Sequence, residues 1–292
     1  MSPGACHGCR RIPPRSSATR CRRCCDSASH KENVMQVVQA NGTETAYAQT
    51  GSGPPLVLLH GAEADHAMFD AFAPLLAPHA TVIACDQRDS GRTRNPPQEY
   101  SLLDLADDVA GVIEGLGHAR AHVFGTSLGG AIAQVLAARH SDKVDRLVLS
   151  STFRVGANLA ALNPEAMQAI AALRAGLPAS AGRIAAWFFT APYQQAHPEV
   201  AAIFAGSTRD EAQKARRAAL MRHPVAIDLA AIRAPTLVLA AAEDRLIPPA
   251  HTLALASDIA GAQAVTIPGI GHVGTIQDPA AVAQAVLRFL SG

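Results

Sequence analysis

The sequence predicts an α/β fold built on a mostly parallel sheet. Short apolar segments such as PPLVLLHG, ATVIACD and APTLVLAAAED alternate with amphipathic helical segments such as 101–117 and 129–140. Strands that are apolar along their whole length are typical of a parallel sheet covered by helices on both faces. In such sheets, functional groups collect at the carboxyl ends of the strands.

The folded part of the chain is expected to begin with a hairpin. MQVVQANGTETAYAQT consists of two short alternating runs around Asn41-Gly42, a strong hairpin signal. Six apolar strand segments follow: PPLVLLHG (strand over 55–60), ATVIACD, ARAHVFG, VDRLVLSS, APTLVLAAAED and AQAVTIPG. The helix expected over 101–117 opens with Ser101 and Asp104 at the spacing of a capping box.

Between about 153 and 233 the alternation stops, and only helical segments are expected. Asn163-Pro164 supplies a cap followed by proline at the first helical position, and Thr208 with Glu211 has the spacing of a capping box. Because this block lies between two strand segments, we expect it to cover the carboxyl edge of the sheet as a helical cap. It contains the aromatic candidates for shaping an acyl pocket, Trp187, Phe188 and Phe189.

Residues 1–33 differ from the rest of the chain. They are rich in Arg, Ser, Pro and Cys without apolar periodicity, which predicts a disordered leader. Two C-x-x-C pairs have the spacing of a zinc site: Cys6, Cys9, Cys21 and Cys24. No apolar residues flank these pairs, so we favour an unstructured leader, or a coding start placed upstream of Met35, over zinc binding. Cys85 is interpreted as a small buried apolar residue.

Composition narrows the class of protein. The 292 residues are 49% hydrophobic and carry a net charge of +1, so no overall field attracts nucleic acid or an acidic membrane. No apolar run approaches the ~20 residues that span a bilayer, and no signal-peptide core is evident near the N-terminus. We therefore expect a soluble cytoplasmic protein, a monomer or homodimer, with neither nucleic-acid nor membrane partners.

HVFGTSLGGA (122–131) makes Ser127 a candidate nucleophile. It stands between an apolar strand and a helix, which is the strand–turn–helix context of a G-x-S-x-G nucleophile elbow. Side chains at Gly125 or Gly129 would collide with the neighbouring helix or strand in so sharp a turn. The N–H of Leu128, at the start of the helix, is a candidate to stabilise an oxyanion.

A serine hydroxyl needs a base, and the base needs an orienting carboxylate. Of the twelve histidines, His272 fits best, because it follows the sixth apolar strand on a glycine-rich loop. Asp244 follows the fifth strand and is preferred to its neighbour Glu243 as the carboxylate. The N–H of Ala62, directly after His60-Gly61, is the second candidate oxyanion donor.

His60 and His66, near this loop, are the main rivals of His272 as the base. Both are also candidate substrate contacts, as are Trp187 and Phe188 of the cap. His60 ends a strand beside Gly61, which favours a structural role. No metal site in the folded part and no organic cofactor are implied.

Five motifs occur in a fixed order along the chain: HG (60–61), D-x-R-x-x-G-x-T (86–93), G-T-S-L-G-G (125–130), D-x-x-x-P (244–248) and G-H (271–272). With these motifs, the segment from about 35 to 292 resembles the α/β-hydrolase fold superfamily. The resemblance implies an eight-stranded, mostly parallel sheet flanked by helices, with a helical cap between its sixth and seventh strands. The core would comprise 34–152 and 234–292, and the cap 153–233. DQRDSGRT and the following helix are similar to 3-oxoadipate enol-lactonases and polyketide methylesterases.

The function expected from these residues is hydrolysis of a small carboxylic ester or lactone through a Ser127–His272–Asp244 triad and an acyl-enzyme. Serine at the nucleophile position argues against haloalkane dehalogenases and the related epoxide hydrolases, which use aspartate there. Three alternatives remain on the same scaffold. They are a carbon–carbon bond hydrolase of the meta-cleavage type, a cofactor-free perhydrolase and a non-catalytic ligand-binding protein.

Several charged residues lie near the candidate site in the sequence. Glu63 and Asp65 flank the candidate oxyanion loop, and they would disfavour anionic substrates if they faced the pocket. The remaining charges are interpreted as structural or solvated: Arg88, Asp89 and Arg92 as an ion-pair cluster, and KARR (214–217) as a solvated helix face.

Overall fold

The computed structural model describes residues 35–220 and 225–292, so the cysteine-rich leader and its zinc alternative lie outside the described residues. Eight strands form one sheet in the order β1-β2-β4-β3-β5-β6-β7-β8. β2 is antiparallel to both neighbours and all other pairs are parallel, which confirms the predicted mostly parallel sheet. The strands are β1 Gln36–Ala40, β2 Thr43–Thr50, β3 Pro55–Leu59, β4 Thr81–Cys85, β5 Ala121–Thr126, β6 Val144–Ser150, β7 Thr236–Ala241 and β8 Gln263–Ile267.

The predicted hairpin joins β1 to β2. Asn41 and Gly42 form its turn, with φ of 48° and 71°. Positive φ at both central residues gives the turn a twist that matches the flanking strands, and Asn and Gly tolerate it best.

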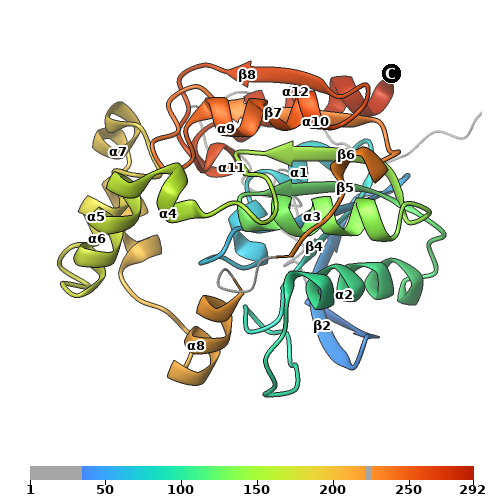
Figure 1. Cartoon of the computed structure of the whole chain (residues 1–292), viewed down its shortest axis with the longest axis horizontal. Helices are drawn as coiled ribbons and strands as arrows, with labels where there is room; N and C mark the ends of the chain where they lie inside the picture. The colour runs from blue at the N-terminus through green and yellow to red at the C-terminus, as the bar shows by residue number, and fades with distance from the viewer. Residues whose placement is uncertain (1–34, 221–224) are drawn as a thin grey trace, which may run out of the picture. The chain divides into compact units, whose positions relative to one another are not determined.

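The sheet carries an apolar core on each face. Along β3, Val57 and Leu59 enter one core while Leu56 and Leu58 enter the other, because successive side chains of a strand point to opposite faces. Helices α2 (Leu102–Gly115) and α3 (Leu128–Arg139) cover the first core. Helices α1 (Ala73–Leu76) and α12 (Pro279–Ser291) cover the second (Figure 1).

Helix α2 begins at the capping box that the sequence predicts. Ser101 Oγ accepts two backbone N–H groups of the first turn, and the Asp104 carboxylate accepts the Ser101 N–H at 2.8 Å. This exchange satisfies donors that the start of a helix leaves unpaired.

The described residues between β6 and β7 contain helices and loops only. The helical elements there are α4 Leu159–Leu162, α5 Pro164–Arg174, α6 Ala181–Ala185, α7 Ala191–Ala196, η2 Pro198–Phe204, α8 Glu211–Ala219 and η3 Leu229–Ala231. The other short elements are η1 His66–Phe69, α9 Pro249–Leu253, α10 Leu255–Asp258 and α11 Gly274–Gln277. No helix among residues 35–220 and 225–292 is long and apolar enough to cross a bilayer.

The helix starts in this segment agree with the sequence at one site and differ at another. Asn163 accepts the N–H of Ala166, and α5 begins with proline, as expected. The prediction of a capping box at Thr208 and Glu211 was wrong. α8 is capped by Asp210, whose carboxylate accepts the Gln213 N–H at 2.8 Å. Asp210 has the extended backbone that an N-cap requires, and Gln213 completes the exchange three residues later.

The cap segment (153–220 and 225–233) contacts loops that follow the carboxyl ends of the strands. Asn163 Nδ2 donates to the carbonyl of Arg245 at 2.8 Å, after β7. The Phe188 carbonyl accepts the N–H of Val273 at 3.3 Å, after β8. In Figure 1, α5, α6 and α7 accordingly stand at the end of the sheet toward which the arrowheads of β6 and β8 point.

Candidate active site

Ser127 occupies a tight turn between β5 and α3. Its φ is 53° and its ψ −120°, a conformation that is strained for any residue but glycine. The neighbouring backbone approaches closely, since a Cβ on Gly125 would lie 2.3 Å from the carbonyl oxygen of Gly129. A Cβ on Gly129 would lie 2.1 Å from the carbonyl oxygen of Leu59. The glycines therefore allow the elbow, and the elbow sets Ser127 at the carboxyl edge of the sheet.

Substituting Gly129 by alanine is expected to lower the free energy of unfolding by about 3 kcal/mol or more, because backbone atoms of β3 would have to move. Gly206 is the matched control, since a Cβ there meets nothing within 4 Å. Urea titrations of both variants check this. Equal midpoints for Gly129→Ala and Gly206→Ala would contradict the steric argument.

The structure brings His272 and Asp244 together. His272 Nδ1 lies 2.7 Å from Asp244 Oδ2, and both residues are buried. Asp244 Oδ1 accepts the N–H groups of Leu246 and Ile247 at 2.9 and 2.8 Å, which fixes the carboxylate. The exposed side chain of Glu243 has no hydrogen bond to His272. No hydrogen bond joins Ser127 to His272 among the described residues. Such contacts are often long before substrate binds.

Two backbone N–H groups beside Ser127 are free to act as donors. Leu128 is the first residue of α3, so its N–H has no partner within the helix. The chain at Gly61 passes close by, since a Cβ there would lie 3.6 Å from the Ser127 Cβ. Among the described residues, neither the Leu128 N–H nor the Ala62 N–H has an acceptor. These are the two donors that the sequence nominates for an oxyanion.

His60 is not available to a substrate. It is fully buried, its Nδ1 lies 2.7 Å from the Gly61 carbonyl oxygen, and its Nε2 accepts the N–H of Gln87 at 3.2 Å. An acceptor Nε2 requires the proton on Nδ1, which then donates to Gly61. Burial, and then the nearby Arg217 charge, lower the pKa of His60 to about 3. The assignment of His60 as a substrate contact was therefore wrong.

The neutral His60 should make stability fall in acid. The unfolded chain takes up a proton near the ordinary His pKa of 6.5, while the folded protein does so only near 3. Between these values the unfolded state binds more protons. His60 alone then lowers the free energy of unfolding by about 1.4 kcal/mol per pH unit as the pH falls from about 6 to about 4. Unfolding titrations of wild type and His60→Asn test this. Equal slopes in that window would contradict it.

His66 also has a hydrogen-bond partner within the protein. Its Nδ1 is 2.8 Å from Asp86 Oδ1, which raises the pKa of His66. Its side chain lines a small cavity beside β2, with Ala48 and Thr50. The contact with Asp86 gives His66 a structural role, and its predicted substrate contact stays a prediction.

Asp65, His66 and Asp86 are close enough to hold a metal ion, and they form the one such group within the part of the chain described. Both Asp86 carboxylate oxygens already accept backbone N–H groups, from His66 and Arg92, each at 2.8 Å. Asp65 accepts the N–H of Ala67 and so caps η1. Every member of this group thus has a structural role, and we assign no metal there.

Of the aromatic candidates in the cap, Phe188 reaches the catalytic histidine candidate. Its ring meets that of His272 edge-on, with centroids 5.6 Å apart. Trp187 instead lies under the guanidinium of Arg245, at 4.5 Å. Phe189 is buried and stacks on Tyr193. Phe188 also packs on Phe204, with centroids 4.6 Å apart, so all three rings have partners within the protein. Of the three, Phe188 is the ring that contacts His272.

Glu63 does not face the site. Its carboxylate pairs with Arg174 at 2.9 Å and with Arg209 at 3.4 Å, both from the cap segment. The two cations offset the charge of Glu63, so the condition under which Glu63 would repel anionic substrates is not met in this arrangement.

The charged residues after β4 form ion pairs with distant partners. Arg88 binds Asp108 with two hydrogen bonds, at 2.6 and 2.7 Å. Asp89 binds Arg216 of α8 in the same way, at 2.8 and 2.7 Å. Arg88 and Asp89 thus form structural ion pairs, as expected, but with partners outside the predicted cluster, and Arg92 has no side-chain partner among the described residues. The interpretation of KARR as a solvated face was wrong for Arg216 and Arg217, which lie against the core.

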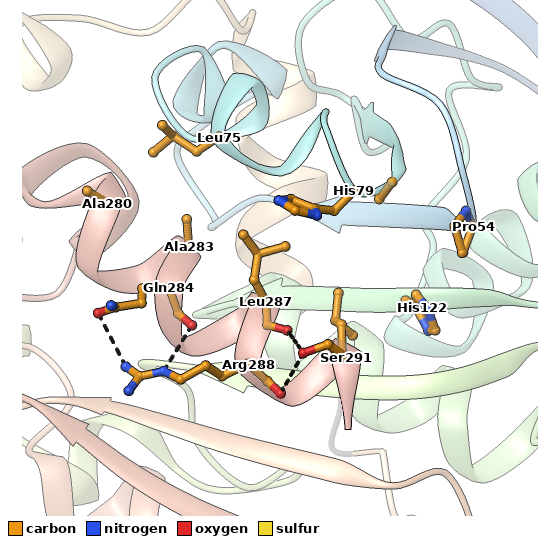
Figure 2. A pocket seen from close by; sticks show the side chains of 12 residues that line it. Pro54, Leu75, His79, His122, Ala280, Ala283, Gln284, Leu287, Arg288 and Ser291 are labelled. Atoms are coloured by element: carbon orange, nitrogen blue, oxygen red, sulfur yellow. Dashed lines mark hydrogen bonds between the residues drawn. The ribbon is translucent and has the colours of Figure 1, made fainter.

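A cleft of about 600 Å³ lies elsewhere in the described chain. Figure 2 shows it between α12 and α1, with Leu75, Leu287, His79 and His122 around it. His122 stands at the amino end of β5, whereas Ser127 follows its carboxyl end. This cleft is therefore separate from the candidate active site.

Comparisons with known proteins place the chain in a family. Residues 54–279 match the family model of the alpha/beta hydrolase fold, and the chain belongs to this family. It is similar to a putative carbamate hydrolase of Caulobacter sp. strain K31, with 29% identity over 72% of this chain and 81% of the relative. A poly(3-hydroxyalkanoate) depolymerase of Ectopseudomonas oleovorans is 30% identical over 81% of this chain and 84% of the relative.

The fold is also similar to that of a solved structure. The enol-lactonase of Burkholderia xenovorans LB400 superposes with a TM-score of 0.76, at 29% identity, over 88% of this chain and all of that one (100%). The relatives share hydrolytic activity but differ in the bond they cleave. Membership of this family therefore establishes a hydrolase fold and supports hydrolysis as the reaction.

Proposed function

We propose that the protein is a serine hydrolase that cleaves a small carboxylic ester or lactone. The observation that carries the proposal is the buried His272–Asp244 pair, which follows β7 and β8 on the same sheet edge as the strained Ser127. A strained serine and an oriented imidazole at one edge are the parts that acyl transfer needs. The carbamate, poly(3-hydroxyalkanoate) and enol-lactone in the names of the relatives support an acyl substrate.

In the proposed reaction, Ser127 Oγ attacks the carbonyl carbon while His272 Nε2 takes the serine proton. Asp244 holds Nδ1–H and stabilises the imidazolium. The N–H groups of Ala62 and Leu128 bind the oxygen that gains the negative charge. The C–O bond then breaks, and the departing alkoxide takes the proton from His272. Water attacks the acyl-enzyme with the same assistance, which releases the acid and restores Ser127.

A substrate panel tests the proposal. It combines p-nitrophenyl esters of graded chain length, lactones, dienoates and peroxide with halide, and it uses chains that start at Met1 and at Met35. Turnover of esters or lactones with covalent fluorophosphonate labelling is the expected result. Turnover of dienoates alone would assign a carbon–carbon hydrolase, and peroxide-dependent halogenation alone would assign a perhydrolase. Tight binding of a panel compound without turnover or labelling would assign a binding protein.

A further inference from the structure

Arg217 of α8 is a buried cation whose described hydrogen-bond acceptors are all neutral groups. The side chain lies within the protein, with 9% of the residue exposed, and it forms no ion pair with any described carboxylate. Burial lowers its pKa. A buried unpaired charge is costly, so its retention calls for a reason beyond packing.

Arg217 contacts both the candidate oxyanion loop (residues 60–64) and the segment after β4, where the Arg88 carbonyl oxygen accepts from its Nη1 at 3.4 Å. Nη2 donates to the carbonyl oxygen of Ala62 at 2.9 Å. Both terminal nitrogens also donate to Gln87 Oε1, at 3.1 and 3.2 Å. The other end of the Gln87 amide donates to the carbonyl oxygen of His60 at 2.7 Å. Arg217 therefore binds the loop directly and, through Gln87, at a second point.

These contacts hold the peptide groups on both sides of the Ala62 Cα. The peptide after Ala62 is held by Arg217. The peptide before it contains the Ala62 N–H and is held by His60 Nδ1 at the Gly61 carbonyl oxygen, at 2.7 Å. Since the N–H and C=O of a planar trans peptide point in opposite directions, fixing that carbonyl aims the Ala62 N–H.

The charge of Arg217 acts on the same site in two ways. It helps to lower the pKa of His60, which keeps that ring neutral and its Nε2 able to accept from Gln87. A cation beside the loop also stabilises negative charge that develops at the substrate oxygen, and more strongly in a buried site than in water.

Other arginines of the cap make different contacts. Arg216, one residue earlier on α8, binds Asp89 and contacts no residue of the oxyanion loop. Arg209 donates to the Ala64 carbonyl oxygen at 3.3 Å and to Ser90 Oγ at 2.7 Å, at the far end of the loop. Of the three arginines, it is Arg217 that donates a hydrogen bond to the Ala62 carbonyl oxygen.

We propose that Arg217 is a positioning residue for the oxyanion hole, so that the cap helix α8 completes the catalytic geometry of the core. The assignment rests on the proposed serine hydrolase function. It makes the rate of acyl transfer depend on a side chain that contacts neither the substrate nor Ser127.

Arg217→Met tests the assignment, with Arg216→Met as the matched control. For Arg217→Met we expect kcat per fluorophosphonate-labelled site to fall about 10- to 100-fold with little change in KM. A trifluoromethyl ketone, which forms a tetrahedral adduct with the serine, should lose affinity by the same factor as kcat/KM. Arg216→Met removes the Asp89 pair but should keep kcat per labelled site near the wild-type value.

Arg217→Lys decides the question if the methionine variant does not fold. Lysine keeps the charge and the stem, but its single nitrogen cannot replace the forked contacts to Ala62 and Gln87, so kcat should fall at least about fivefold. Unchanged kcat in a folded Arg217 variant, or equal losses in the Arg216 and Arg217 variants, would overturn the assignment alone. A wild-type protein that neither labels nor hydrolyses any ester or lactone would overturn the proposed function and the assignment with it.

Discussion

Replacing Ser127 by alanine is expected to abolish fluorophosphonate labelling and to lower kcat by about 10⁶-fold. Without Oγ no acyl-enzyme forms, and only the oxyanion donors and substrate binding remain to assist water. The fold should survive, because the Ser127 side chain makes no hydrogen bond to any described residue. Alanine also keeps the Cβ that the turn already accommodates at φ 53°. Kinetics, labelling and thermal unfolding of the same preparation measure the effect.

Ser151→Ala is the control for that substitution. Ser151 also has a positive φ, 43°, although it is buried whereas Ser127 is half-buried, and it follows the carboxyl end of the neighbouring strand β6. It should label and turn over substrate like the wild type. Ester turnover that survives Ser127→Ala at the wild-type rate would reject Ser127 as the nucleophile.

The elbow, the acid and the base could be nominated from the sequence because each is a local pattern at the end of an apolar strand. Because parallel strands run in the same direction, their carboxyl ends meet at one edge of the sheet. Strand ends alone do not separate Asp244 from its neighbour Glu243. The D-x-x-x-P spacing to Pro248 favours Asp244, and the two side chains do differ, one buried beside His272 and one exposed.

Arg217 could not be recognised in the same way. Its partners Ala62 and Gln87 lie 155 and 130 positions away in the chain, and a charged run on a short helix is usually solvated. One local signal was available. Leu220 is buried and lies three residues after Arg217, so the two share a helix face. The burial of an arginine follows from tertiary contacts, which propensity and spacing do not encode.

The side-chain directions of the two rival histidines could not be predicted from the sequence either. His60 and His66 are close to the oxyanion loop in sequence, yet each ring is turned toward a structural acceptor, Gly61 in one case and Asp86 in the other. Proximity along the chain places both histidines beside the candidate oxyanion loop. It did not report the direction of the side chains, because that depends on Gln87 and Asp86 arriving from β4.

Asp244→Asn should lower kcat by about 10⁴-fold while leaving the nucleophile in place. The asparagine amide has one favourable orientation at this position. Its oxygen must accept the N–H groups of Leu246 and Ile247, as Oδ1 does now, so its NH₂ group faces His272 Nδ1. Nδ1 must then accept, which moves the imidazole proton to Nε2. A protonated Nε2 cannot take the proton of Ser127.

Glu243→Gln is the matched control for this substitution, since it removes a neighbouring carboxylate that is exposed and makes no contact with His272. It should keep kcat near the wild-type value. In Asp244→Asn, fluorophosphonate labelling should become slow but still reach completion, because Ser127 remains and only its activation is lost. A large loss in Glu243→Gln with little loss in Asp244→Asn would exchange their roles. Equal, small losses in both would mean that His272 does not act as the base.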